Sequence, residues 1–242
     1  MTKLYTKWAW VYRDMYRSIF DYRKQFLRFK SILEKYGCRS VLELGCGAGN
    51  LAPYFLSAGY QYTGVDVAEE MVAIARQEHP DARFLQGDMR RFSVPGKVDG
   101  VLVAGRSFAY MTGNRDVLAA LGSMRKALKP NGILIVDAFD AAGIFTSFRE
   151  RMQEDVRYEG RRFVRESRLS KNLEGGWTWN WDARYVVHDG GKKLSFRERS
   201  VLRAFTPDEL RLFLALARFE TLRISRRGVT LLAVGRRTQS RG

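Results

Sequence analysis

The chain has 242 residues, which suits one large α/β domain and is short for two domains joined by linkers. Hydrophobic residues make up 45% of it, which excludes a disordered chain, and no apolar run reaches the roughly 18 residues that a membrane span needs. The net charge of +16 attracts anions and keeps nucleic acid open as a partner, with an arginine-rich solvated surface as the simpler explanation.

The first half of the chain predicts helices that alternate with strands. Residues 13–36 carry apolar side chains at helical spacing and predict a surface helix that ends at Gly37. Strands are then expected at 40–44, 60–65, 83–85, 98–103 and 133–136, with helices at 50–57, 68–76 and 116–128. This alternation implies a parallel sheet with right-handed crossovers, whose ligands bind beyond the carboxyl ends of the strands.

After Asp137 the hydrophobic pattern changes to period two, which predicts an antiparallel insertion at about 145–204. Trp177, Trp179 and Trp181 are expected on one face of a strand, as a packed face in preference to a stacking platform. The pair Gly190-Gly191 suits a hairpin turn.

The end of the chain predicts one helix and a closing hairpin. Thr206 as N-cap, Pro207 in the first turn and Glu209 three residues after the cap predict a helix to about residue 216. Strands at 219–224 and 229–234 then complete the sheet. We therefore expect a helical entrance segment at 1–37 and one domain at 38–242.

The two cysteines, Cys38 and Cys46, have no metal-ligand spacing, and we expect no metal. Cys46 lies inside a glycine-rich turn, where a disulfide would block a ligand site. The N-terminus lacks the apolar stretch of a secretory signal. A reduced, cytoplasmic setting is therefore expected.

The main chemical signal is the glycine-rich turn after the first strand, at residues 45–49. Its glycines allow a sharp turn and close approach of the backbone to a ligand, and the following helix offers free N–H groups. The spacing is G-x-G-x-G, whereas a dinucleotide turn reads G-x-G-x-x-G. An acidic residue, Glu43, stands two positions before the first glycine.

Two further acidic residues stand at the ends of the next strands. Asp66 follows Glu43 by 23 positions, where a carboxylate can accept both ribose hydroxyls of a nucleoside. Asp88, in the stretch Gln86-Gly87-Asp88-Met89, ends the third strand. Together the three signals predict a nucleoside cofactor.

In order and spacing, these motifs resemble the class I S-adenosylmethionine-dependent methyltransferases over residues 38–138 and 205–236. The resemblance implies a Rossmann-like, seven-stranded α/β fold with an antiparallel sheet inserted after the fifth strand. It implies S-adenosyl-L-methionine as cofactor and S-adenosyl-L-homocysteine as product. The cofactor-binding residues it implies are Tyr16, Glu43, Gly45, Cys46, Gly47, Gly49, Asp66, Val67, Met71, Asp88, Met89 and Ala104.

Residues 104–110 follow the fourth strand, nearest the methyl group in this family. They lack the N-P-P-Y motif of amino-group methylases of DNA and protein, which favours a small-molecule acceptor. Residues 79–90 and the tyrosine-rich stretch 12–16 are similar to amino-sugar N,N-dimethyltransferases. Ala217-Arg218-Phe219 departs from the Ala-Gly-Phe of many of those relatives.

The acceptor atom is left open between nitrogen and oxygen. A neutral amine attacks without a strong base, whereas a hydroxyl benefits from one. Candidate catalytic residues are Tyr16, Tyr110 and His188. A packing role is equally natural for Tyr16, a place in the pocket wall is favoured for Tyr110 because it follows the fourth strand, and a structural role is favoured for His188. His79 is expected to be exposed in a loop.

Two other classes of function stay open at this point. An RNA methyltransferase would use the basic C-terminal cluster for phosphate contact; its members are Arg223, Arg226, Arg227, Arg236, Arg237 and Arg241. A regulatory module would bind the cofactor without catalysis. The expected assembly is a monomer or a homodimer, with no membrane partner.

Overall fold

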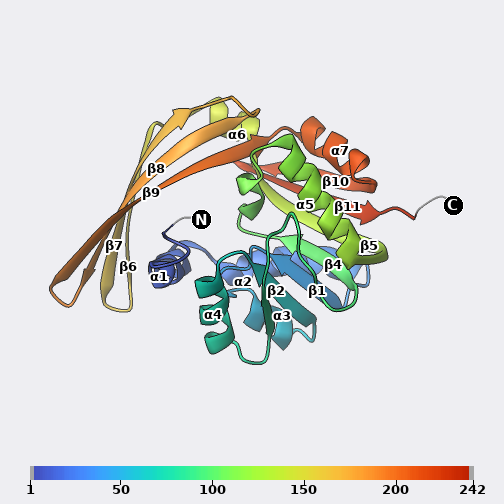
Figure 1. The fold of residues 1–242 in the computed structure, drawn as a ribbon, viewed down its shortest axis with the longest axis horizontal. Helices are drawn as coiled ribbons and strands as arrows, with labels where there is room; N and C mark the ends of the chain where they lie inside the picture. Colours follow the sequence, from blue (N-terminus) through green and yellow to red (C-terminus); the bar gives the residue numbers. More distant parts are fainter. Residues whose placement is uncertain (1–2, 240–242) are drawn as a thin grey trace.

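The central sheet has the seven strands that the resemblance implied, and their order is β3-β2-β1-β4-β5-β11-β10 (Figure 1). The computed structural model describes residues 3–239. Strands β1 to β5 run parallel, while β11 is antiparallel to both β5 and β10. The strands are β1 (Ser40–Leu44), β2 (Gln61–Asp66), β3 (Arg83–Gln86), β4 (Val98–Val103), β5 (Leu128–Asp140), β10 (Phe219–Arg227) and β11 (Thr230–Arg237).

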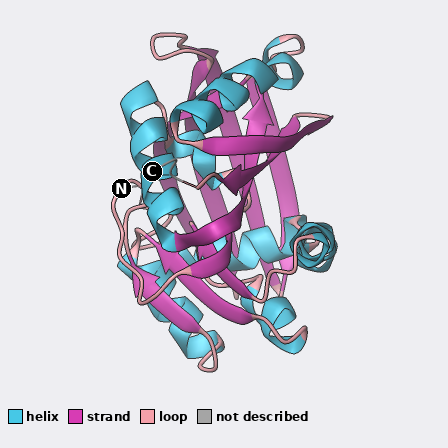
Figure 2. Cartoon of the chain, turned by 90° about the vertical axis from the view of Figure 1, so that its right-hand side faces the viewer, coloured by secondary structure: helices cyan, strands magenta, loops and turns pink. Residues whose placement is uncertain are grey.

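Helices cover both faces of this sheet (Figure 2). Because side chains alternate along a strand, Leu42 and Leu44 of β1 face one layer and Val41 faces the other. The first layer contains α5 (Asn114–Ala127) and α7 (Pro207–Leu216). The second contains α2 (Tyr22–Lys35), α3 (Ala52–Ser57) and α4 (Glu69–Glu78). None of the helices in the described part of the chain is long and apolar enough to cross a membrane.

The predicted insertion is a four-stranded antiparallel sheet that extends away from the central sheet (Figure 1). Its strands are β6 (Arg151–Tyr158), β7 (Arg161–Lys171), β8 (Thr178–Asp189) and β9 (Lys192–Phe205). The short helix α6 (Ala141–Phe145) leads into it. Strand β9 pairs in parallel with the end of β5, through Phe139–Ala204 and Asp140–Phe205. The two sheets are therefore hydrogen-bonded to each other.

The entrance segment contains two helices where one was predicted over 13–36. Helix α1 (Ala9–Ile19) ends before Phe20, whose backbone is extended, and α2 begins after Asp21. The Asp21 side chain accepts a hydrogen bond from the Lys24 amide, so it caps α2 as a new helix. Figure 1 shows α1 beneath the inserted sheet and apart from α2.

The tryptophan stripe is only partly as predicted. Trp177 precedes β8 and is 41% exposed beside Phe145. Trp179 is fully buried, and Trp181 donates its indole N–H to Ser167. The stripe therefore serves packing where it lies in the strand.

Another difference concerns β5, which runs over 128–140 where only 133–136 was predicted. Its first residues bulge around Asn131, which has a φ of 62°. The predicted helix stop at 129–132 is therefore part of the strand.

Helix α7 begins with the predicted capping box, in which Thr206 accepts from the Glu209 amide and Glu209 accepts from the Thr206 amide. We expect Thr206→Ala to lower the free energy of unfolding by about 1 kcal/mol, because one helical N–H loses its acceptor. Urea denaturation measures this. Thr206→Ser keeps the hydroxyl and is the control, so an equal loss in both variants would contradict the capping role.

Candidate active site

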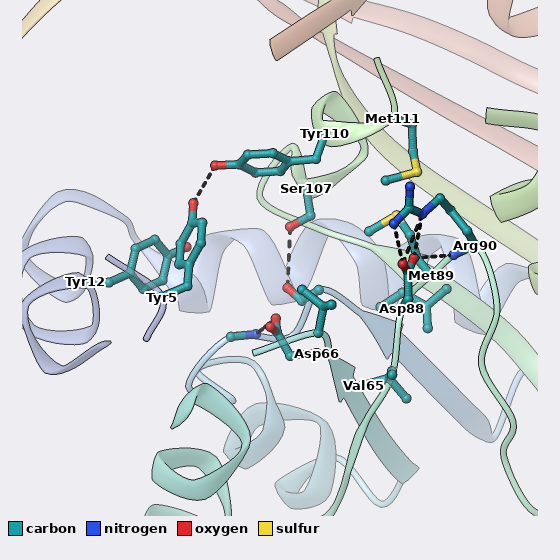
Figure 3. Close-up of a pocket in the computed structure, with 15 residues that line it drawn as sticks. Tyr5, Tyr12, Val65, Asp66, Asp88, Met89, Arg90, Ser107, Tyr110 and Met111 are labelled. Atoms are coloured by element: carbon teal, nitrogen blue, oxygen red, sulfur yellow. Dashed lines mark hydrogen bonds and ion pairs between the residues drawn. The ribbon is translucent and has the colours of Figure 1, made fainter. Parts of the chain in front are cut away.

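A cavity of about 330 Å³ opens at the carboxyl ends of the parallel strands (Figure 3). Its volume falls within the usual range for small-molecule sites. Loops that follow β1, β2, β3 and β4 form most of its wall, and the N-terminal segment closes it. The lining residues are Tyr5, Tyr12, Leu44, Gly45, Gly47, Val65, Asp66, Val67, Gly87, Asp88, Met89, Arg90, Ser107, Tyr110 and Met111.

The floor of the cavity is the glycine-rich turn after β1. Gly45 has a φ of 71°, and a Cβ atom there would lie 2.7 Å from the Cβ of Ser107. The Gly45 amide donates to the carbonyl of Val65 at 2.8 Å, which fixes the turn to β2. Position 45 therefore requires glycine for both its backbone angle and its close neighbour.

Asp66 stands at the end of β2 and faces the cavity. Its two carboxylate oxygens accept hydrogen bonds from the amides of Gly47 at 2.8 Å and Ala68 at 2.9 Å. Burial raises the pKa of Asp66, and these hydrogen bonds offset part of that shift. A carboxylate oxygen can accept more than one hydrogen bond, so Asp66 can still accept from ligand hydroxyls.

Asp88 and Arg90 form an ion pair at another side of the cavity (Figure 3). The Nη2 atom of Arg90 lies 2.5 Å from Oδ2 of Asp88, and Arg90 also contacts Asp116 at 3.1 Å. The guanidinium lowers the pKa of Asp88. Asp88 is therefore an ionised acceptor held in place beside the apolar side chain of Met89.

Three tyrosine rings form the wall opposite the ion pair (Figure 3). Tyr5 and Tyr12 come from the N-terminal segment, and Tyr110 ends the 3-10 helix η1 (Ser107–Tyr110). The hydroxyls of Tyr5 and Tyr110 are hydrogen-bonded at 2.7 Å. Such electron-rich ring faces favour a cationic group in the cavity.

Glu43 lies beneath the glycine turn and outside the cavity lining. The Tyr62 hydroxyl donates to Glu43 Oε2 at 2.5 Å. Burial raises the pKa of Glu43 to about 8, although the hydrogen bond from Tyr62 lowers it, and the nearby charge of Asp66 raises it further. Glu43 therefore supports the strand ends from below.

Six of the predicted cofactor-binding residues come together in the cavity: Gly45, Gly47, Asp66, Val67, Asp88 and Met89. Cys46 and Ala104 are buried in the core behind it. Gly49 packs against Phe84, and Met71 of α4 packs against Ala9 of α1. Cys38 and Cys46 are both free, buried thiols.

The predicted catalytic candidates are dispersed. Tyr110 lines the cavity, but Tyr16 accepts a hydrogen bond from Arg165 Nη1 at 2.6 Å and so faces the inserted sheet. His188 is exposed near the hairpin between β8 and β9, where it lies opposite Lys193 in the strand register, and it does not line the cavity. The prediction that His79 is exposed was wrong, because its ring is half-buried near Phe84.

Several lining residues were missed by sequence reasoning. Tyr12 and Ser107 lie in stretches that had been singled out, the tyrosine-rich entrance and the loop after the fourth strand, so weak signals existed for both. Arg90 ends the stretch 79–90 that resembles the amino-sugar enzymes, whereas Tyr5 and Met111 carried no signal, because their role depends on how the N-terminal segment and the loops fold over the turn. Within residues 3–239, no group of three or more metal-binding side chains is present.

Residues 41–132 match a protein family described as "Methyltransferase domain". Over 153 residues the chain is 28% identical to dTDP-3-amino-3,4,6-trideoxy-alpha-D-glucopyranose N,N-dimethyltransferase from Streptomyces venezuelae, with 63% of each chain covered. The chain spans about three fifths of the length of the curated relatives it matches first.

Solved structures match over nearly the whole chain. The sugar N-methyltransferase KedS8 from Streptoalloteichus sp ATCC 53650 aligns with a TM-score of 0.81 and 25% identity, covering 93% of this chain and 92% of that one. CalS10, an amino pentose methyltransferase from Micromonospora echinaspora solved with S-adenosylmethionine bound, aligns with a TM-score of 0.80 and 24% identity, covering 94% and 97%.

The family match, the sheet order and the glycine turn agree with the class that the sequence predicted: residues 41–132 match a methyltransferase domain, and the chain has the Rossmann-like fold of S-adenosylmethionine-dependent methyltransferases. The fold is shared, over more than nine tenths of the chain, with the sugar N-methyltransferase KedS8 and with CalS10.

The pKa of Glu43 predicts how stability depends on pH. Glu43 holds its proton up to about pH 8 when folded, whereas an unfolded glutamate loses it near pH 4.3. The folded state therefore binds the extra proton between these values, so this group lowers the free energy of unfolding as pH rises through that window, at most by about 1.4 kcal/mol per pH unit.

We expect Glu43→Gln to remove this decline, so that the variant gains stability relative to the wild type from pH 5 toward pH 8. Urea denaturation across this pH range measures the difference. Glu34→Gln, on the exposed side of α2, is the control and should show no such trend. A constant difference between Glu43→Gln and wild type would contradict the raised pKa.

Proposed function

We propose that this protein transfers a methyl group from S-adenosylmethionine to an amine nitrogen of a small, sugar-like molecule. The observation that carries the proposal is the composition of the main cavity. A glycine turn, two carboxylates at the ends of neighbouring strands and a wall of tyrosine rings surround one space of about 330 Å³. These groups match the parts of a positively charged sulfur nucleoside.

The residues present fit the cofactor part by part. The Asp66 carboxylate would accept hydrogen bonds from the ribose hydroxyls. Val67 and Met89 would lie along the purine, with Asp88 toward its amino group. The lack of a side chain at Gly45 allows the amino-acid part to approach the backbone closely, and the tyrosine rings suit the positive sulfur. When bound, the cofactor supplies an activated methyl group, which the amine nitrogen accepts as the carbon–sulfur bond breaks, leaving S-adenosylhomocysteine and a proton released to water.

The methyl acceptor would bind between the N-terminal segment and the inserted sheet. The N-terminal segment forms part of the tyrosine wall, and this covering excludes water and holds the acceptor against the cofactor cavity. A neutral amine needs no strong base, and none of the histidines in the described chain lines the cavity. The name of the Streptomyces venezuelae relative, an amino-sugar N,N-dimethyltransferase, supports the nitrogen over the oxygen acceptor.

The alternative of an RNA substrate is less well supported. In the described part of the basic C-terminal cluster, Arg226 pairs with Asp140 at 2.8 Å and Arg236 with Glu220 at 3.5 Å; Arg241 lies outside the described residues. None of the described members lines the cavity. RNA binding that weakens steeply with salt would favour the alternative. A cytoplasmic location and a monomeric or dimeric state stay predictions.

The cofactor is tested by calorimetric titration of the wild type with S-adenosylmethionine, S-adenosylhomocysteine and NAD. We expect micromolar binding of the two sulfur nucleosides and none of NAD. Asp66→Ala should weaken that binding by roughly 10- to 100-fold, because the ribose loses a charged acceptor. Asp81→Ala removes an exposed carboxylate and is the control. Preference for NAD, or unchanged affinity in Asp66→Ala, would reject the assignment.

A further inference from the structure

A second, smaller cavity of about 50 Å³ lies between the N-terminal segment and the inserted sheet. Tyr5 and Tyr110 line both this inner cavity and the cofactor cavity, and their hydrogen-bonded hydroxyls stand between the two spaces. The inserted sheet contributes Trp181, Tyr185 and Glu198 to its wall. The inner cavity is therefore bounded mainly by aromatic rings, with one carboxylate.

That carboxylate is unusual in its surroundings. Glu198 is only 8% exposed, and its Oε1 atom has no hydrogen-bond partner in the described part of the chain. Its neighbour across the strands is Ala183, a small residue that leaves space above it. A buried carboxylate oxygen is costly when no donor reaches it. Within residues 3–239, no group donates to this oxygen.

The charges near Glu198 do not supply that group. Arg165, 6% exposed on the same face of the sheet, is paired with Glu154 at 2.9 Å and bonded to Tyr16. Burial raises the pKa of Glu198, whereas the backbone amides of Leu4 and Lys3, the charge of the exposed Lys3 and the charge of the N-terminal amine lower it. These contacts leave Oε1 without a donor.

We propose that the inner cavity recognises the cationic amine group of the methyl acceptor, with Glu198 as its counter-charge and the tyrosine and tryptophan rings as its walls. The inference rests on the proposed function and names the feature of the acceptor that this protein selects. An ammonium group gains charge–charge attraction to a carboxylate and cation–π contact with aromatic faces, whereas a neutral hydroxyl gains only a hydrogen bond to the carboxylate. The cavity has room for such a head group and not for a whole sugar.

The position of the inner cavity suits an acceptor that must reach the cofactor. The two spaces share Tyr5 and Tyr110 as lining residues, and the hydroxyls of these residues are hydrogen-bonded to each other at 2.7 Å. An amine held beside Glu198 therefore lies next to the cofactor cavity, and its nitrogen accepts the methyl group only after the ammonium has given a proton to Glu198 or to water.

The test compares a charged and a neutral fragment of similar shape. Full-length protein saturated with S-adenosylhomocysteine is titrated with cyclohexylamine, which is protonated at neutral pH, and with cyclohexanol, and ligand-observed NMR measures both affinities. The wild type should bind the ammonium about tenfold more tightly. Glu198→Gln should lose this preference, while Glu198→Asp should keep much of it. Glu166→Gln, an exposed carboxylate on the outer face of the same sheet, is the control.

The affinity for S-adenosylhomocysteine separates the possible failures. If the wild type does not bind S-adenosylhomocysteine, the proposed function fails. If it binds S-adenosylhomocysteine but shows no preference for the ammonium, or no fragment binding, the inference alone is overturned. If Glu198→Gln weakens the binding of S-adenosylhomocysteine as much as the binding of cyclohexylamine, Glu198 only anchors the N-terminal segment, and the inference is likewise overturned.

Discussion

The site depends above all on the docking of α1 between the inserted sheet and the core. Asp14 of α1 is fully buried and contacts Arg13 at 2.6 Å and Arg161 of β7 at 3.3 Å. Arg13 also reaches Glu78 at the end of α4, at 3.0 Å. Removing one partner from such a buried set leaves an uncompensated charge, so the set holds one arrangement firmly. Helix α1 is thereby tied to the insertion on one side and to the cofactor-binding core on the other.

Apolar packing follows the same arrangement. Val11 and Met15 pack against Phe163 and other side chains of the inserted sheet, while Ala9 packs against Ala48 and Met71 of the core. The helix therefore presents one side to each sheet, and the preceding segment carries Tyr5 across the cavity mouth. The insertion, although remote in sequence from the glycine turn, determines the shape of the cavity through α1.

This dependence explains which parts of the site could be predicted from the sequence. The glycine turn, Asp66 and Asp88 are local features: each follows directly from a strand end, so spacing along the chain was enough to place it. The choice between Tyr12 and Tyr16 was not local, because it depends on the rotation of α1 once it docks. Tyr16 turns toward Arg165 of the insertion, and Tyr12 toward the cavity.

The fold, like the site, has parts that follow from local sequence and parts that depend on tertiary contacts. The seven strands and the capping box of α7 follow from periodicity and local capping chemistry, and they were predicted. The break at Asp21 was not, because the apolar pattern of the residues around it continues at helical spacing. Nor was the importance of Glu198, because alternation along β9 shows that position 198 faces inward but not that its neighbours leave an oxygen unpaired.

The two cavities favour cations although the protein as a whole carries a positive charge. A net charge of +16 repels cations, yet both proposed ligands carry positive charge. Exposed arginines act weakly at such sites, because salt screens their field beyond about 8 Å. Near the cavities, Arg90 and Arg165 are each paired with a carboxylate. Asp66 and Glu198 form no ion pair within the described chain, so the negative charge that a bound cation meets comes from these two side chains.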